Sequence, residues 1–257
     1  MGADKDKGVN ISDLGIRTVS ALAMLAVAGT ALWLGGLWWF GLVVLVAAGV
    51  MREWQALVLR FSSALAQRIV WSLSGVLYIG LAAAMLAFLR SDMFGVSMVL
   101  VVVGAVIATD IGAYFAGRTI GGPKIAPALS PSKTWAGLVG GIFGAFLVVL
   151  AWRIYSHYDF VQATAMIVVP ARDPSVFDGL AWGATLGQSA VMGAGIAIVA
   201  QAGDFFQSWM KRRAGVKDSG NLIPGHGGVF DRVDGLMAVC FVAGLAMILS
   251  GSAAGLA

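Results

Sequence analysis

Residues 93–116 read MFGVSMVLVVVGAVIATDIGAYFA, an apolar run in which the only charged side chain is Asp110. About 20 consecutive apolar residues are enough for a helix to cross the hydrocarbon core of a membrane. We therefore predict a membrane-spanning helix here. An ionisable residue inside such a helix is costly to place, so Asp110 is a candidate functional residue.

The whole chain has the composition of a membrane protein. Its 257 residues are 59% hydrophobic and 12% charged, with a mean hydropathy of +0.88, whereas soluble domains carry roughly 25% charged residues. The pI near 9.5 is more typical of basic cytoplasmic loops than of nucleic-acid binding, and we expect no nucleic-acid partner. We predict an all-α, polytopic bundle of helices that forms a single domain over residues 1–257.

Seven apolar runs are long enough to be spanning helices. They cover residues 16–34, 36–51, 69–89, 93–116, 135–155, 180–202 and 235–256. We expect the first to be a retained helix rather than a cleaved signal peptide, because no small-residue cleavage site accompanies it. The second is short enough to tilt or to re-enter the membrane. The many Gly and Ala residues suit close contacts between helices in lipid.

The basic residues predict the orientation of the chain in the membrane. Alternate loops carry all but a few of the 17 Lys and Arg residues, namely Lys5, Lys7, Arg17, Arg52, Arg60, Arg68, Arg118, Lys124, Lys133, Lys211, Arg212, Arg213, Lys217 and Arg232. The other loops hold only Arg90, Arg153 and Arg172. Because cytoplasmic loops are enriched in basic residues, we expect an inner-membrane protein with a cytoplasmic N-terminus and an external C-terminus.

A first polar cluster occupies residues 109–137, TDIGAYFAGRTIGGPKIAPALSPSKTWAG. Asp110 and Tyr114 are one helical turn apart and share a face. Glycines and prolines then end the helix and leave Arg118, Lys124, Ser130 and Lys133 near the interface. Backbone N–H groups with lysines nearby can bind phosphate. A flexible basic loop that binds anionic lipid is an equally good interpretation of this cluster alone.

A second cluster follows the sixth apolar run. Asp204, Ser208 and Lys211 are spaced i, i+4 and i+7, so one helix face carries a carboxylate, a hydroxyl and an ammonium group. The alternative is a helix end that forms a salt bridge at the membrane interface. Lys217 and Asp218 come next in a glycine-containing loop.

A third cluster is residues 224–234, PGHGGVFDRVD. Gly227 and Gly228 allow positive φ and a close approach of the backbone to a ligand. Asp231 and Asp234, at i and i+3, share a face where the last helix begins. Carboxylates without histidine or thiolate partners favour Mg²⁺, and His226 alone is a weak zinc signal.

The predicted topology brings the three clusters to one side of the membrane. Aspartates for a metal ion, basic residues for phosphates and glycine loops for close approach describe a phosphoryl- or nucleotidyl-transfer site. The chain has neither a P-loop nor a dinucleotide-binding fingerprint.

Residues 208–234, SWMKRRAGVKDSGNLIPGHGGVFDRVD, resemble the signature of the phosphatidate cytidylyltransferase (CDP-diacylglycerol synthase) family. That signature runs Ser-x-x-Lys-Arg, four residues, Lys-Asp, a turn of small residues, then His-Gly-Gly-x-x-Asp-Arg-x-Asp, and every fixed position matches. The segments DIGAYFAGR and SPSKTWAG and the pair Glu53-Trp54 are also similar to the family. One position departs, since relatives usually carry Glu where this chain has Ala136.

The resemblance implies that CTP and phosphatidate react to give CDP-diacylglycerol and pyrophosphate, with Mg²⁺ required. On this basis Asp204 and Asp231 are expected to be metal ligands, with Asp234 and Asp110 as further candidates. The phosphate-binding residues are expected to be Lys133, Lys211, Lys217 and Arg232. Substrate orientation is expected from Ser130, Ser208, Asp218, His226, Gly227 and Gly228. The lipid bilayer is a third partner, and a homodimer is a candidate assembly.

Three other functions remain open at this stage. A cation- or proton-coupled transporter would use Asp110 and Asp204 as its intramembrane acids, but it leaves the basic, glycine-rich loops unexplained. A CDP-alcohol phosphatidyltransferase would carry Asp-Gly-x-x-Ala-Arg, which this chain lacks. A non-catalytic lipid-binding scaffold would be consistent with Ala136 if that position marks a lost activity.

Overall fold

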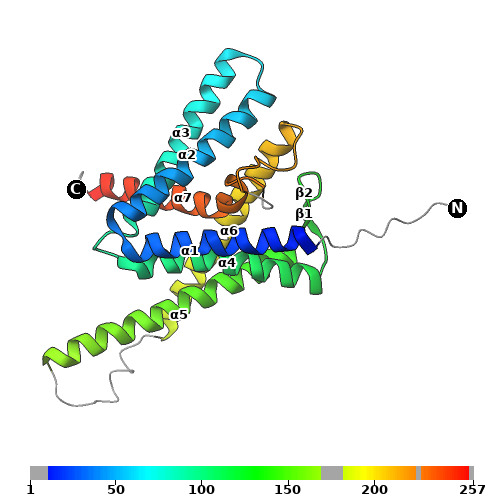
Figure 1. The fold of residues 1–257 in the computed structure, drawn as a ribbon. Helices are drawn as coiled ribbons and strands as arrows, with labels where there is room; N and C mark the ends of the chain where they lie inside the picture. The colour runs from blue at the N-terminus through cyan, green and yellow to red at the C-terminus, as the bar shows by residue number, and fades with distance from the viewer. Residues whose placement is uncertain (1–10, 169–181, 224–226, 255–257) are drawn as a thin grey trace. The chain divides into compact units, whose positions relative to one another are not determined.

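The computed structural model describes residues 11–168, 182–223 and 227–254, and these residues form seven helices and one short hairpin (Figure 1). The elements are α1 (Ile11–Leu34), α2 (Gly36–Phe61), α3 (Leu65–Phe88), α4 (Gly95–Thr119), β1 (Lys124–Ala126), β2 (Ser130–Thr134), α5 (Trp135–Val168), α6 (Trp182–Arg213) and α7 (Phe230–Ala254). By length and composition, α2 to α7 are able to cross a membrane, whereas the apolar part of α1, Thr18–Leu34, is shorter. The predicted all-α, polytopic membrane architecture is confirmed.

The second helix is longer than predicted. We expected a short run over residues 36–51, but α2 continues to Phe61, so that Arg52 and Arg60 lie within the helix and not in a loop. The extension is stabilised by a buried face that includes Trp54, Leu57 and Val58. These side chains recur at helical spacing and pack inside the protein. The stabilisation from their burial outweighs the unfavourable effect of the polar residues among them.

The segment between α4 and α5 folds as a hairpin, not as a flexible basic loop. Strands β1 and β2 pair antiparallel, with Lys124 opposite Thr134 and Ala126 opposite Ser130. Positive φ at Gly121 and Gly122 turns the chain out of α4. The hydroxyl of Thr134 then accepts a hydrogen bond from the N–H of Gly137 at 3.0 Å, which caps the start of α5.

The described contacts divide the chain into two compact units. Unit 1 comprises residues 1–96 and 210–233, and unit 2 comprises residues 97–209 and 234–257. Helices α6 and α7 each contribute residues to both units, so neither unit is a continuous stretch of sequence. The single domain over residues 1–257 stays a prediction.

Unit 1 is built around Trp54, which is 1% exposed. Its ring packs against Trp71 and Tyr78 of α3 and Phe230 of α7, and its indole N–H donates to the carbonyl of Trp71 at 2.9 Å. The α3 backbone comes this close because residue 75 is glycine: a Cβ there would lie 2.5 Å from Nε1 of Trp54. The buried indole thus joins α2, α3 and the start of α7.

Unit 2 is held together by close contact between α4 and α5. A Cβ on Gly112 of α4 would overlap the carbonyl of Gly140, and a Cβ on Gly144 of α5 would overlap the carbonyl of Ala108. Small residues on both helices therefore bring the two backbones into contact, which is the main source of helix association in lipid. The predicted role of these glycines in helix packing is confirmed at this contact.

The α4–α5 contact predicts different effects for two Gly→Ala substitutions in α4. Gly112→Ala should lower the thermal stability of the detergent-solubilised protein by about 1–3 kcal/mol, because the new methyl group meets only backbone atoms. Gly104→Ala is the matched control, since its nearest new contact is an ordinary 3.5 Å to Val148. Equal melting temperatures for the two variants would contradict the proposed packing.

Candidate functional site

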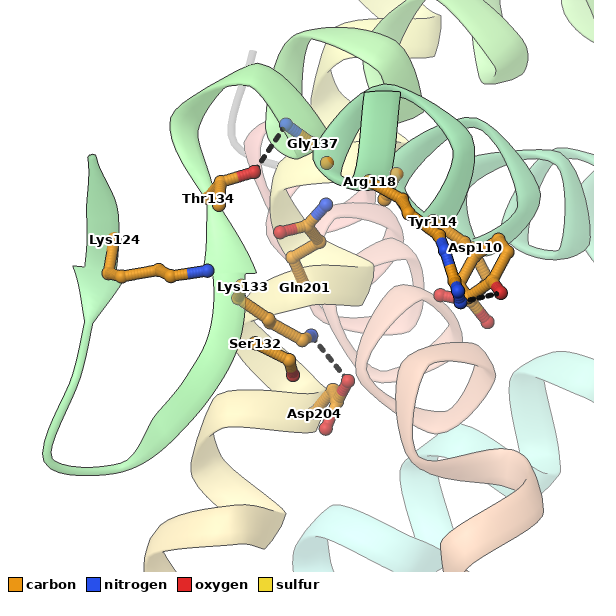
Figure 2. A pocket seen from close by; sticks show the side chains of 12 residues that line it. Asp110, Tyr114, Arg118, Lys124, Ser132, Lys133, Thr134, Gly137, Gln201 and Asp204 are labelled. Atoms are coloured by element: carbon orange, nitrogen blue, oxygen red, sulfur yellow. Dashed lines mark hydrogen bonds and ion pairs between the residues drawn. The ribbon is translucent and has the colours of Figure 1, made fainter. Parts of the chain in front are cut away.

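A pocket of about 420 Å³ opens within unit 2, between α4, the hairpin and α6 (Figure 2). Helix α4 contributes Asp110, Tyr114 and Arg118 to its lining, the hairpin contributes Lys124, Ser132, Lys133 and Thr134, and α6 contributes Gln201 and Asp204. Two carboxylates and three cations therefore line one cavity. Of the predicted site residues, the structure brings Asp110, Lys133 and Asp204 together here.

The α4 wall of the pocket is one helical face. Asp110, Tyr114 and Arg118 follow at intervals of four residues, as the sequence predicts for Asp110 and Tyr114. The guanidinium of Arg118 donates a hydrogen bond to the hydroxyl of Tyr114 at 2.8 Å and lies 5.8 Å from the centre of its ring. Tyr114 thereby orients a cation along the wall.

An ion pair between Lys133 and Asp204 joins the hairpin to α6 (Figure 2). The two side chains are 21% and 34% exposed, and the Lys133 ammonium lies 4.8 Å from the centre of the Phe205 ring. The position of Lys133 follows from its neighbour, because Thr134 is buried and caps α5. A threonine directly before an apolar run is the sequence signal for such a cap.

Asp204 and Ser208, two of the three residues predicted to share a face of α6, do so in the part of the helix that belongs to unit 2. The hydroxyl of Ser208 donates to the carboxylate of Asp204 at 3.4 Å, four residues earlier. Among the polar lining residues, Ser132, Thr134 and Gln201 were not predicted. Gln201 is one helical turn before Asp204, so helical spacing alone could have predicted that both face the pocket. Ser132 lines the pocket, whereas the predicted Ser130 does not.

A second polar cluster lies in unit 1, around Asp231 at the start of α7. Its carboxylate is within hydrogen-bond distance of four donor groups: the ammonium of Lys211 at 2.8 Å, the N–H and hydroxyl of Ser219 at 2.9 and 3.0 Å, and the N–H of Gly228 at 3.1 Å. The Lys211 and Asp231 side chains are only 15% and 9% exposed. This carboxylate is thus bound by its own chain.

Glu53 of α2 completes the cluster, although the sequence analysis gave it no role. Its side chain is buried, and its carboxylate accepts hydrogen bonds from the N–H groups of Val229 and Phe230, both at 2.9 Å, and from the hydroxyl of Ser219 at 2.7 Å. A carboxylate is favourable at this place because the first N–H groups of a helix have no partner within the helix. In the sequence, only the similarity of the pair Glu53-Trp54 to the family pointed to this residue.

The remaining predicted residues are dispersed. Lys217, Asp218 and Arg232 are exposed in unit 1. Asp234 is partly buried in unit 2 and accepts the N–H of Gly235 at 2.9 Å, while His226 lies outside the described residues. Gly227 has the predicted positive φ, of 81°. The space beside Gly228, expected to admit a ligand, is taken by Glu53 and Ser219 of the same chain.

The predicted set of three aspartate ligands is not seen as a group. Within residues 11–168, 182–223 and 227–254, no three His, Cys, Asp or Glu side chains are placed to hold one metal ion. Asp231 belongs to unit 1, whereas Asp204 and Asp234 belong to unit 2. The metal site of these three residues stays a prediction.

Comparison with known proteins assigns the family. Residues 58–250, most of the chain, match the model of the cytidylyltransferase family. The chain belongs to this family. The match includes both polar clusters except Glu53, which lies just before it.

Three relatives named phosphatidate cytidylyltransferase illustrate the similarity. The protein from Brucella suis is 40% identical over 173 residues, which are 65% of this chain and 53% of that protein. The chain thus spans about half the length of this relative. The protein from Rickettsia bellii is 32% identical over 244 residues, 92% of this chain and 90% of that protein. A third, from Rickettsia felis, is 31% identical over 201 residues.

The geometry distinguishes two lysines that the sequence analysis treated alike. Lys211→Ala should destabilise the protein by about 1–3 kcal/mol, because it leaves the largely buried Asp231 carboxylate without its charged partner. Lys217→Ala should leave stability unchanged, because Lys217 is exposed. Thermal unfolding in detergent measures both, and equal stability of the two variants would contradict a structural role for the Lys211–Asp231 pair.

Proposed function

We propose that this chain is a phosphatidate cytidylyltransferase, which converts CTP and phosphatidate to CDP-diacylglycerol and pyrophosphate. The observation that carries the proposal is the unit 2 pocket, where Lys133, Arg118 and Lys124 accompany two carboxylates in a member of the cytidylyltransferase family. The names of the Brucella and Rickettsia relatives support the same activity.

The chemistry of this reaction requires charge neutralisation more than proton transfer. A phosphate oxygen of phosphatidate attacks the α-phosphorus of CTP, and the bond from that phosphorus to the pyrophosphate oxygen breaks. The attacking oxygen is already anionic near neutral pH, so a general base contributes little. The barrier comes from bringing two polyanions together and from the charge that develops on pyrophosphate, which fixed cations reduce.

The pocket residues supply such cations in fixed positions. Lys133 is oriented by Asp204 and by the Phe205 ring, and Arg118 is oriented by Tyr114. Lys124 approaches from the neighbouring strand. We propose that these three side chains bind substrate phosphates. In unit 1, the exposed side chains of Lys217 and Arg232 are proposed to contact phosphates as well, while Lys211 acts through its pair with Asp231.

The donor set of the pocket fits Mg²⁺. Asp110 and Asp204 both line an open cavity, and Mg²⁺ is usually bound by one or two carboxylates together with substrate phosphates. Asp231 fits less well, since the Lys211 ammonium and the N–H groups of Ser219 and Gly228 already donate to its carboxylate. We therefore propose Asp110 and Asp204 as the magnesium ligands. Bound there, the ion would offset negative charge on the phosphates of CTP.

A transporter function is less well supported. A cation pathway would place its acids in a spanning segment without competing fixed cations, whereas the carboxylate of Asp204 is paired with Lys133 and shares its pocket with Arg118 and Lys124. A CDP-alcohol phosphatidyltransferase would consume CDP-diacylglycerol instead of forming it, so the direction of product formation separates the two enzymes.

The activity test is an incubation of purified protein with labelled CTP, phosphatidate and Mg²⁺, with detection of a CDP-lipid. Lys133→Ala should lower kcat by about 10²–10³, the usual loss when one fixed charge-stabilising contact is removed. Arg60→Ala, an exposed basic residue on α2, is the control and should retain wild-type turnover. No CDP-lipid from the wild-type protein, with or without added Mg²⁺, would exclude the proposed activity.

We also propose that this is an inner-membrane protein whose basic loops face the cytoplasm. The Arg213 guanidinium lies 5.8 Å from the centre of the Phe61 ring, so the last residues of α6 and α2 are in contact within unit 1. Basic residues lie close to both of these helix ends. Arg90 instead binds the carbonyl of Leu32 near the end of α1, next to the start of α2 and so at the opposite end of α2 from Phe61. The homodimer expected from the sequence analysis stays a prediction.

Cysteine labelling in intact cells tests the orientation. In a Cys240→Ser background, Asp92→Cys should react with a membrane-impermeant maleimide, because residue 92 is exposed in the proposed external turn. Arg60→Cys should react only after the cells are permeabilised. The reverse pattern would show that the basic loops are external.

A further inference from the structure

The pair Glu53-Trp54 of α2 contacts the start of α7 within unit 1. Glu53 accepts the N–H groups of Val229 and Phe230 at the start of α7, and Trp54 packs its ring against Phe230 with 6.0 Å between ring centres. Phe230 is fully buried. The beginning of α7 is therefore held by both a charge and an aromatic contact from one helical turn of α2.

The backbone of the loop between α6 and α7 is in close contact with Glu53 at two further places. A Cβ on Gly220 would lie 2.6 Å from Oε1 of Glu53, and a Cβ on Gly228 would overlap both Oε2 of Glu53 and Oγ of Ser219. Any side chain at either position would force the loop away from the carboxylate. These glycines therefore allow the backbone to surround Glu53.

Ser219 connects Glu53 to Asp231. Its hydroxyl lies 2.7 Å from Oε2 of Glu53 and 3.0 Å from Oδ2 of Asp231, and its N–H donates to the same Oδ2 at 2.9 Å. A hydroxyl carries one hydrogen, so it donates to one carboxylate at a time, and the shorter distance favours Glu53. A displacement of Glu53 is thus transmitted through Ser219 to the carboxylate of Asp231 and to its partner Lys211.

We propose that Glu53 is a positioning residue for the transfer reaction. Glu53 fixes the positions of Ser219 and of the start of α7. These in turn orient the charged groups of Asp231 and Lys211, and of Lys217 and Asp218 in the adjoining loop segment. This inference rests on the proposed function. Outer-shell partners that orient functional groups typically change activity 10–100-fold when they are removed, because small displacements of fixed charges reduce transition-state stabilisation.

Two variants and one matched control test the proposal. Glu53→Gln replaces one acceptor oxygen by an amide donor facing N–H groups, whereas Ser219→Ala removes only the hydroxyl link and leaves the bonds to Val229 and Phe230 in place. Ser72→Ala is the control, since the Ser72 hydroxyl also donates to a polar side chain of α2, Gln55, at 2.9 Å. That bond has no connection to Asp231.

Two readouts are measured at a temperature well below the melting point of each variant. Turnover gives kcat and KM, and hydrogen exchange of the peptide over residues 227–234 reports whether the N–H groups of Val229 and Phe230 remain protected. We expect kcat to fall about 10–100-fold in both Glu53→Gln and Ser219→Ala. Ser72→Ala should keep wild-type kcat. Exchange should accelerate in Glu53→Gln and stay close to wild type in Ser219→Ala.

The outcomes separate this inference from the proposed function. Wild-type kcat in both variants, with faster exchange in Glu53→Gln, would overturn the positioning role and leave Glu53 purely structural. Wild-type exchange in Glu53→Gln would overturn the idea that Glu53 holds the loop at all. If the wild-type protein forms no CDP-lipid, the proposed activity fails and the catalytic part of this inference fails with it, while the exchange rates still decide whether Glu53 fixes the start of α7.

Discussion

Pairing of charge is the constraint on which this structure depends, because several charged side chains of a chain with only 12% charged residues lie largely out of contact with water, Glu53 and Asp231 among them. Removing an ion from water costs several kcal/mol unless partners replace its hydration. Three carboxylates of the two clusters follow this rule, each with a different partner. Asp204 pairs with Lys133, Asp231 with Lys211, and Glu53 with the first N–H groups of α7.

The two ion pairs differ in what they leave available. Lys133 and Asp204 line an open pocket with Asp110 and Arg118, so both partners of this ion pair are accessible from the cavity. Lys211 and Asp231 are mostly buried, and the backbone of Ser219 and Gly228 also binds the carboxylate. The first arrangement suits substrate binding, while the second suits the maintenance of a fixed loop shape.

Sequence patterns anticipated a large part of this organisation. Apolar run length predicted the spanning helices, and helical spacing predicted the shared faces of Asp110 with Tyr114 and of Asp204 with Ser208. These are local properties, since a helix repeats every few residues. The β1–β2 hairpin and the extension of α2 were missed, because β1 is three residues long and the buried face of α2 is defined by side chains from elsewhere in unit 1.

By itself, the sequence determined the all-α membrane architecture, the candidate residues and the similarity to cytidylyltransferases. Only the tertiary structure decided what each residue contacts. Lys211 and Lys217 have the same chemistry and stand six positions apart, yet one is paired with Asp231 and the other is exposed. Glu53 reaches Phe230 across 177 positions of the chain. Such partners depend on how separate helices pack, and packing brings together residues whose spacing along the chain carries no periodic signal.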